Sequence, residues 1–97
     1  MTLKTFAPSG ADTVTLAAAT TSARAQLDPN SSTVRVVNDG TATAFLQFGD
    51  SNVASSAAKM PIKAGETETF TKGANTHVAA VTASGTTNLY FTNGEGL

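Results

Sequence analysis

The sequence predicts an all-β protein: a single small β-sandwich, or a small barrel, of seven or eight antiparallel strands preceded by an extended N-terminal arm. Three observations predict it. Short segments with apolar residues at every second position recur about every 8–12 residues, which is the spacing of paired strands. Turn residues such as Asp39-Gly40 separate these segments. Threonine, a strand-favouring residue, occurs 17 times, and no segment between the strands reads as a crossover helix.

The composition predicts one thin-cored domain. The chain has 97 residues, a formal net charge of −1 and no cysteine, so disulfides are excluded. Thr, Ala, Ser and Gly fill 50 positions, whereas Leu, Ile, Val and Phe together fill 19. So few large apolar side chains form only a small core. Without disulfides, association with a partner subunit is the common way in which such a domain gains stability. The composition therefore favours an oligomer or a protein seated on a larger surface.

Residues 1–11 are predicted to be an N-terminal arm, and residues 12–97 the sandwich domain. The arm carries Leu3 and Phe6 in otherwise small and polar sequence, and a Pro-Ser-Gly stretch ends it. Two interpretations stay open. The arm is either a frayed terminus or a segment that docks on a neighbouring molecule through Leu3 and Phe6.

The first elements follow this arm. Val14 and Leu16 alternate with threonines and predict a strand over 12–19. Residues 23–27 also alternate, although their alanines permit a short helix. Asp28-Pro29-Asn30-Ser31 predicts a turn, because proline fixes φ and the Asx side chains bond to the local backbone.

The centre of the chain predicts a β-hairpin. Residues 33–38 form its first strand, Asp39-Gly40 its turn, and residues 41–49 its return strand. Phe45 interrupts the alternation of the return strand. Either both faces of that strand are covered, or a bulge turns the Phe45 side chain.

The last third continues the pattern. Met60 to Lys63 contains a proline and predicts a short edge segment, followed by strands over 66–72 and 76–82. Residues 83–86 are predicted to be a hairpin loop into a final strand over 87–92. The alternating pattern gives a predicted core: Val34, Val36, Leu46, Phe48, Val78, Leu89 and Phe91.

Tyr90 lies opposite Leu89 and Phe91 in the alternation of the last strand, so we expect it to point away from the core. One interpretation is a tyrosine at the edge of the core with its hydroxyl in water. The other is an interface anchor, because aromatic residues are enriched at protein–protein interfaces.

The residue types do not indicate an enzyme, a metal or a cofactor. His77 is the only histidine, no serine motif accompanies it, and one histidine without cysteine cannot hold zinc within one chain. Glu66 and Glu68 alternate on a predicted strand and most simply are two solvated charges. Six basic residues are scattered among seven acids, so no nucleic-acid footprint is present. No apolar stretch is long enough for a membrane span or a signal peptide, which predicts a cytoplasmic product.

The central and C-terminal stretches resemble a group of small tailed-phage virion proteins. The shared motifs are a strand with V-x-N-x-G (Val36 to Gly40), a return with F-x-x-F-G (Phe45 to Gly49), and a G-x-x-x-x-F strand (Gly65 to Phe70). Two more follow: A-x-x-x-x-G-T (Ala80 to Thr86) and T-x-G-x-G (Thr92 to Gly96). The resemblance covers about two thirds of the chain, and its motifs mark turns and core aromatics rather than a site.

The resemblance implies a capsid decoration, or cement, protein. Such proteins are often β-sandwiches or jelly rolls and often sit as trimers at the symmetry points of a shell. It implies the major capsid protein or another virion protein as partner, and a location on the capsid surface after synthesis in the host cytoplasm. A tail or fibre accessory protein, or a receptor-binding module, is the alternative. Leu3, Phe6 and Tyr90 are the candidate contact residues.

Overall fold

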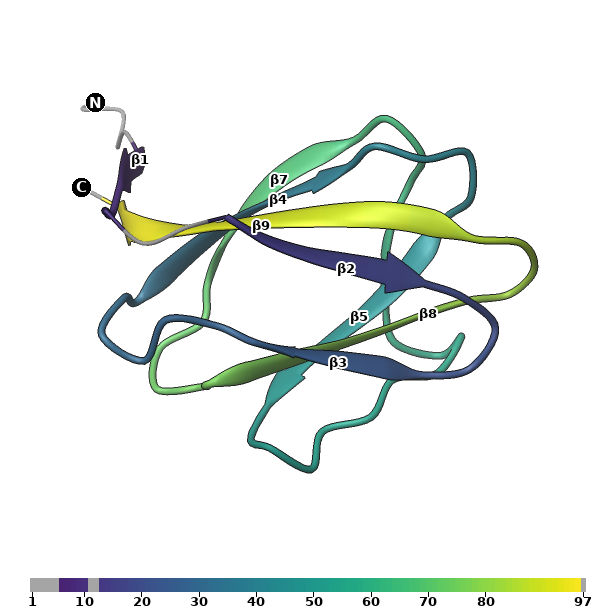
Figure 1. The fold of residues 1–97 in the computed structure, drawn as a ribbon, viewed down its shortest axis with the longest axis horizontal. Helices are drawn as coiled ribbons and strands as arrows, with labels where there is room; N and C mark the ends of the chain where they lie inside the picture. The colour runs from purple at the N-terminus through teal and green to yellow at the C-terminus, as the bar shows by residue number, and fades with distance from the viewer. Residues whose placement is uncertain (1–5, 11–12, 97) are drawn as a thin grey trace.

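Strands make up the regular structure of the chain, as the alternating pattern predicts (Figure 1). The computed structural model describes residues 6–10 and 13–96, and this part contains nine strands and no helix. The segment 23–27, for which a short helix is the alternative, forms a strand. The strands are β1 (Phe6–Pro8), β2 (Val14–Ala18), β3 (Ala23–Gln26), β4 (Thr33–Asn38), β5 (Ala44–Gly49), β6 (Met60–Ile62), β7 (Thr67–Thr71), β8 (His77–Thr82) and β9 (Thr87–Gly96).

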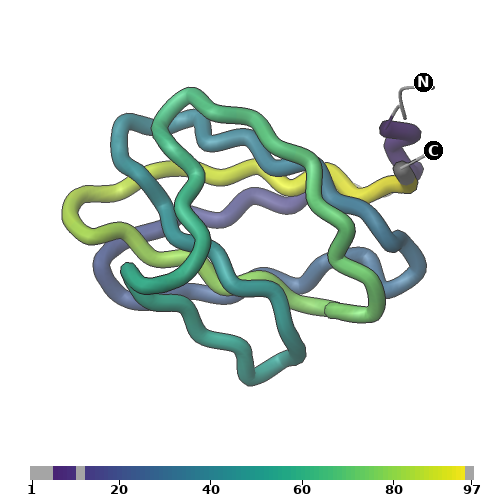
Figure 2. The backbone as a smooth tube through the Cα atoms, turned by 180° about the vertical axis from the view of Figure 1, so that it is seen from behind, coloured from purple at the N-terminus to yellow at the C-terminus, as the bar shows by residue number. Residues whose placement is uncertain are grey.

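Two antiparallel sheets face each other, and both views show them as separate layers (Figure 1 and Figure 2). Sheet A has the order β2-β9-β4-β7, with β1 on the same edge of β9 as β2 but farther along it. Sheet B has the order β3-β8-β5-β6. Of the connections from β2 to β9, only β5–β6 joins two strands of the same sheet. Every other connection passes from one sheet to the other.

The hydrophobic core lies between the two sheets. Six of the seven predicted core residues are buried, with Val36 from β4, Phe91 from β9 and Val78 from β8 fully so. Phe48 is the exception, because it is half-buried and packs against the rim of the core. Its ring lies 5.7 Å from that of Phe70 on β7, and the pair closes the gap between the sheets near the β7 edge.

The predicted hairpin at Asp39-Gly40 is wrong, because the chain crosses there from sheet A to sheet B. A two-residue hairpin turn of this type needs φ above zero, and Gly40 does not have it. The glycine serves another purpose. A methyl group at position 40 would overlap the Thr87 side chain at the start of β9. Gly40 therefore permits a close approach between two chain segments rather than a tight turn.

The predicted hairpin loop over 83–86 is also wrong. It links β8 of sheet B to β9 of sheet A, so the two strands that it joins do not pair. Gly85 has a φ of 75°, a backbone conformation that favours glycine, so a turn does form here. The turn connects strands of different sheets. Turn residues report a change of direction, and they do not report which strand the chain pairs with next.

The chain itself covers the outer face of sheet B over β5 and β8, whereas Arg24 and Gln26 of β3 stay exposed on that face. Ala79 and Val81 alternate with the core residues of β8, yet both are buried. Residues 50–59, which connect β5 to β6, are held here by Ser55. Its backbone N–H donates to Ser22 Oγ at 2.9 Å, and its hydroxyl donates to the carbonyl of Phe45 at 2.7 Å. The interrupted alternation at Phe45 thus reflects a strand covered on both faces, the first of the two alternatives.

Residues 6–8 of the predicted arm form β1, which pairs with residues 94–96 of β9. Leu3 lies outside the described residues, so an arm over 1–11 stays a prediction. Within residues 6–10 and 13–96, no helix is long and apolar enough to cross a membrane.

The close approach at Gly40 generates a stability prediction. We expect Gly40→Ala to lower the free energy of unfolding by about 1–3 kcal/mol, because the added methyl group must push apart the β4–β5 crossing and β9. Gly10→Ala is the matched control, since nothing lies within 4 Å of the methyl group that it adds. Urea unfolding of both variants checks this. Equal midpoints would contradict the close approach.

The burial difference between two phenylalanines generates a second prediction. Phe91 is fully buried, so Phe91→Ala is expected to lower the free energy of unfolding by about 3–5 kcal/mol. Phe48 is half-buried, so Phe48→Ala should lower it by clearly less, about 1–3 kcal/mol. Thermal unfolding of both variants gives the order, and a larger loss at Phe48 would contradict this core.

Candidate functional site

The described residues hold no concentration of catalytic or metal-binding groups. Within residues 6–10 and 13–96, no group of three or more His, Cys, Asp or Glu side chains could hold a metal ion. His77 starts β8 and is half-buried, with Nδ1 2.8 Å from the Thr76 hydroxyl. Glu66 lies before β7 rather than on it, and its carboxylate accepts the Lys63 N–H at 2.9 Å. Glu66 therefore closes a turn, separate from Glu68 on the strand.

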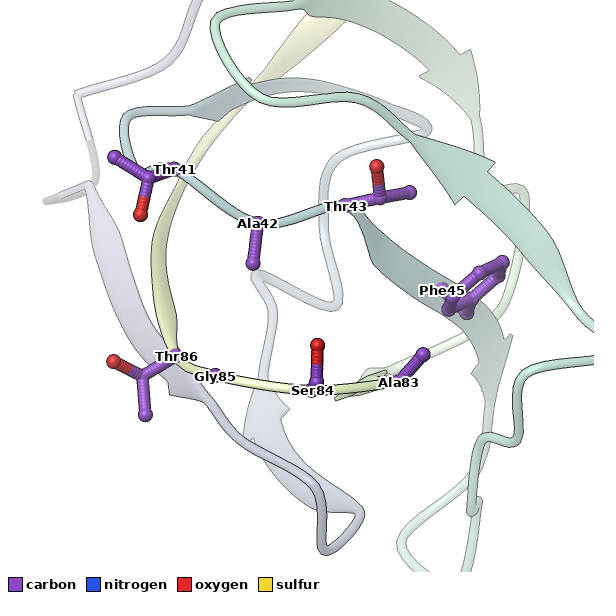
Figure 3. A pocket seen from close by; sticks show the side chains of 8 residues that line it. All are labelled: Thr41, Ala42, Thr43, Phe45, Ala83, Ser84, Gly85 and Thr86. Carbon is purple, nitrogen blue, oxygen red and sulfur yellow. The ribbon is translucent and has the colours of Figure 1, made fainter.

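An open pocket of about 390 Å³ lies where two sheet-to-sheet connections meet (Figure 3). The β4–β5 connection forms one wall and the β8–β9 connection the other, and the Ser84 hydroxyl points across the opening toward Ala42. The lining residues are Thr41, Ala42, Thr43, Phe45, Ala83, Ser84, Gly85 and Thr86. These side chains offer hydroxyl groups and one aromatic ring but no ionisable group. The pocket can hydrogen-bond a small polar group and has no acid, base or activated nucleophile.

Sequence reasoning misses this pocket. Both of its walls read as separate hairpin turns, each belonging to its own pair of strands. Because both connections cross between the sheets instead, they come together at one end of the molecule. Only the pairing of the strands reveals that juxtaposition.

The outer face of sheet A is a second candidate surface. Tyr90 lies on the central strand β9, half-buried, and points away from the core, as the alternation predicts. Thr15 of β2 and Val37 of β4 flank it in register. The next row contains Arg35 beside Thr92. This outer face, unlike that of sheet B, shows exposed side chains on each of the strands β2, β4, β7 and β9.

Phe6 packs against its own chain. It is half-buried on β1, and a methyl group at Gly94 would lie 2.7 Å from Phe6 Cζ, so the ring sits directly over that glycine. Part of its apolar surface is therefore covered without any partner. Phe6 pairs with Gly96, six residues along β9 from Tyr90, which is a separation of about 20 Å along a strand. By this register the Phe6 side chain lies on the same face of sheet A as Tyr90, at the far end of β9.

A polar cluster joins the β3–β4 and β7–β8 loops to the end of β9, at the β1 end of the molecule. The backbone N–H of Ser32 donates to Glu95 at 3.0 Å, and the Ser32 hydroxyl donates to the same carboxylate. These bonds, the hydroxyl first, hold the pKa of Glu95 below its ordinary value of 4.5. The Asn30 N–H, then the Ser31 hydroxyl, lower the pKa of Asp28 from 3.8.

Lys72, although buried, belongs to the same cluster. Its Nζ donates to the carbonyl of Asn75 at 3.0 Å, and its charge lowers the pKa of both Asp28 and Glu95 by a lesser amount. A buried ammonium needs partners of this kind. The donors and acceptors are mostly satisfied within the chain, so the cluster fastens loops together.

Comparison with protein-family models, with curated proteins and with solved structures finds no match to this chain.

The polar cluster generates a pH prediction. Both carboxylates have lowered pKa values in the folded chain, so they stabilise the fold only while ionised. That contribution is complete above the ordinary values of 4.5 and 3.8 and is lost as the pH falls through the lower folded values. We expect the Tm to fall below about pH 4.5. Glu95→Gln should flatten this fall, and Ser32→Ala should do the same. Profiles parallel to that of the parent chain would contradict the assignment.

Proposed function

We propose that this protein is a structural virion protein that decorates and stabilises a phage capsid by binding its shell surface. The proposal starts from the resemblance of its central and C-terminal motifs to small tailed-phage virion proteins. The positions of those motif residues support it. Asn38 is buried at a sheet crossing, and Gly65 and Gly85 have φ of 79° and 75° in turns. These are structural roles, as expected of motifs that mark a scaffold rather than an active site.

We also propose that the fold is a jelly roll. Counted from β2 as the first of eight, the two sheets read 1-8-3-6 and 2-7-4-5. That is the strand order of a jelly roll, an architecture that recurs in capsid and lectin domains. The crossing of nearly every connection from one sheet to the other follows from that order.

The observation that carries the proposal is the difference between the two outer faces. Residues 50–59 are fastened over part of sheet B, next to β5, whereas sheet A keeps an open and sparsely charged face across all four strands, with Tyr90 on its central strand. Tyrosine is enriched and charged residues are depleted at the centres of protein interfaces. A rigid sheet that presents threonine hydroxyls around one tyrosine suits contact with an extended protein surface. Modest contacts suffice there, because many copies act together.

In this proposal the protein is not an enzyme and uses no cofactor, metal, nucleic acid or membrane. The major capsid protein or another virion protein is the partner, and the protein acts as a symmetric oligomer, for which the resemblance favours a trimer. The protein is made in the host cytoplasm and resides on the capsid surface.

The pocket at the sheet crossing supports a second candidate, a tail or fibre accessory protein that binds a receptor. Its hydroxyl groups and the Phe45 ring are the groups with which a protein holds a small polar ligand such as a sugar. Copy number separates the two candidates. Roughly hundreds of copies per virion indicate decoration, and about a dozen or fewer indicate a tail or fibre part.

The open face generates a binding prediction. Tyr90→Ala is expected to weaken binding to capsids stripped of this protein by about thirtyfold, the effect of losing one aromatic anchor. Thr41→Ala, in the pocket, is the matched control and should bind like the parent chain. The measurement is co-sedimentation of the purified variants with the capsids.

The same assay decides among the surfaces. Unchanged binding by Tyr90→Ala together with weakened binding by Phe6→Ala would move the contact to the N-terminal segment. Loss of binding only in Thr41→Ala would move the capsid contact to the pocket.

A further inference from the structure

Strand β7 forms one edge of sheet A and has a single neighbour. It pairs with β4 and, within residues 6–10 and 13–96, with no other strand. Figure 1 shows it at the margin of the sheet. Four of its five residues are exposed, and only Phe70 is half-buried. One side of β7 therefore faces solvent along its whole length.

The alternation of hydrogen bonds fixes which backbone groups face that side. In an antiparallel pair, directly bonded positions alternate with unbonded ones along each strand. At the two ends of the β4–β7 ladder, the Lys72 N–H donates to the Ser32 carbonyl at 2.8 Å, and the Asn38 N–H donates to the Glu66 carbonyl at 3.0 Å. The even-numbered residues of both strands therefore form the bonded pairs. The backbone N–H and C=O groups that point away from β4 belong to Thr67, Thr69 and Thr71.

Of the features that keep edge strands apart, the β7 edge has one, the charge of Glu68, which lies on the same face of the sheet as Phe70. Proline, lysine, bulges and short length are the usual means of blocking an edge. The β6 edge has three residues, one of them Pro61, and the β3 edge has Arg24. The β2 edge is in contact with β3 of sheet B, whereas β7, in the part of the chain that the structure describes, has no such neighbour beside its free edge. By contrast, β7 has five residues, three threonines and a phenylalanine, with Glu68 as its one charge.

The sequence of β7 is symmetric in its outward-facing positions. Threonine occupies all three, so a two-fold axis through Thr69 places threonine opposite threonine in each bonded pair. The same axis places Glu68 opposite Phe70 of a second copy, so like charges do not lie opposite each other. An isologous two-fold contact is the commonest way in which identical chains associate.

We propose that β7 is a self-association edge, at which the β7 strands of two copies pair antiparallel about Thr69 and join their A sheets into one continuous sheet. Thr69 then lies opposite Thr69 of the second copy, and Thr67 opposite Thr71. The half-buried ring pair of Phe70 and Phe48 lies beside the contact and loses its remaining exposure there. This inference goes beyond capsid decoration and does not depend on it, because free protein suffices to test it.

Thr69→Pro tests the proposal directly. Proline lacks the N–H that the second copy needs, yet the Thr69 N–H makes no bond to β4, and proline is tolerated at outward-facing edge positions. Thr69→Val is the matched control, since it keeps the N–H and the strand propensity. Sedimentation equilibrium up to about 1 mM protein should show a dimer for the parent chain. The association should weaken by about tenfold or more in Thr69→Pro and by less than about threefold in Thr69→Val.

A second measurement holds even if the proline variant fails to fold. The chain has no cysteine, so single cysteines report their own encounters. Under mild oxidation, Thr69→Cys should form disulfide-linked dimers much faster than Thr15→Cys, which lies on the opposite edge of the same sheet. A parent chain that stays monomeric at every concentration would overturn the proposal. So would dimers that survive Thr69→Pro, or equal cross-linking at the two cysteine positions. Self-association without capsid binding would leave the inference standing and remove the decoration function.

Discussion

The side chain of Asn38 ties together segments of both sheets, and the rest of the fold depends on it. The residue is fully buried at the end of β4. Its Nδ2 donates to the carbonyls of Ala42 at 2.9 Å and Ile62 at 3.0 Å, and its Oδ1 accepts from Gly40 N–H at 3.2 Å and from the Thr87 hydroxyl. The amide nitrogen thus donates two hydrogen bonds and the amide oxygen accepts two. A buried polar side chain is tolerated when its hydrogen bonds are satisfied in this way. These contacts fasten the β4–β5 crossing to β6 and to the first residue of β9.

This constraint also explains why a chain with so few large apolar residues can define one arrangement. Burial of valines, leucines and alanines favours two packed sheets but only loosely specifies where each connection turns. A buried amide needs hydrogen-bond partners for both its nitrogen and its oxygen, so it specifies the position of each connection far more closely. The pocket follows from it, because the crossing that Asn38 stabilises stands beside the β8–β9 connection. A hollow lined by hydroxyl groups is thus a by-product of how the sheets are joined.

The sequence predicts the strands and most of the core, because the two-residue period of a strand is a local property that Val34, Val36, Leu89 and Phe91 display openly. It does not predict sheet membership. Asp39-Gly40 is a strong local hairpin signal, yet the decisive contacts of this corner involve Thr87, which is 49 residues from Asn38. The covering of Phe45 by residues 50–59 is equally non-local. Of the candidate site, only the outward direction of Tyr90 follows from the pattern, and the pocket, built from two distant connections, does not.

The two ends of the molecule differ in the parts of the chain that they hold. Strand β1 and the last residues of β9 lie together at one end, whereas the connections that line the pocket lie at the other (Figure 1). A tag or a foreign domain joined directly to Phe6 or to Gly96 would therefore emerge from the same side and leave the opposite tip clear. A short peptide inserted among the exposed residues 83–86 would project the other way. The protein can thus carry two attached groups held apart along its 38 Å length, which suits it to use as a small spacer for display.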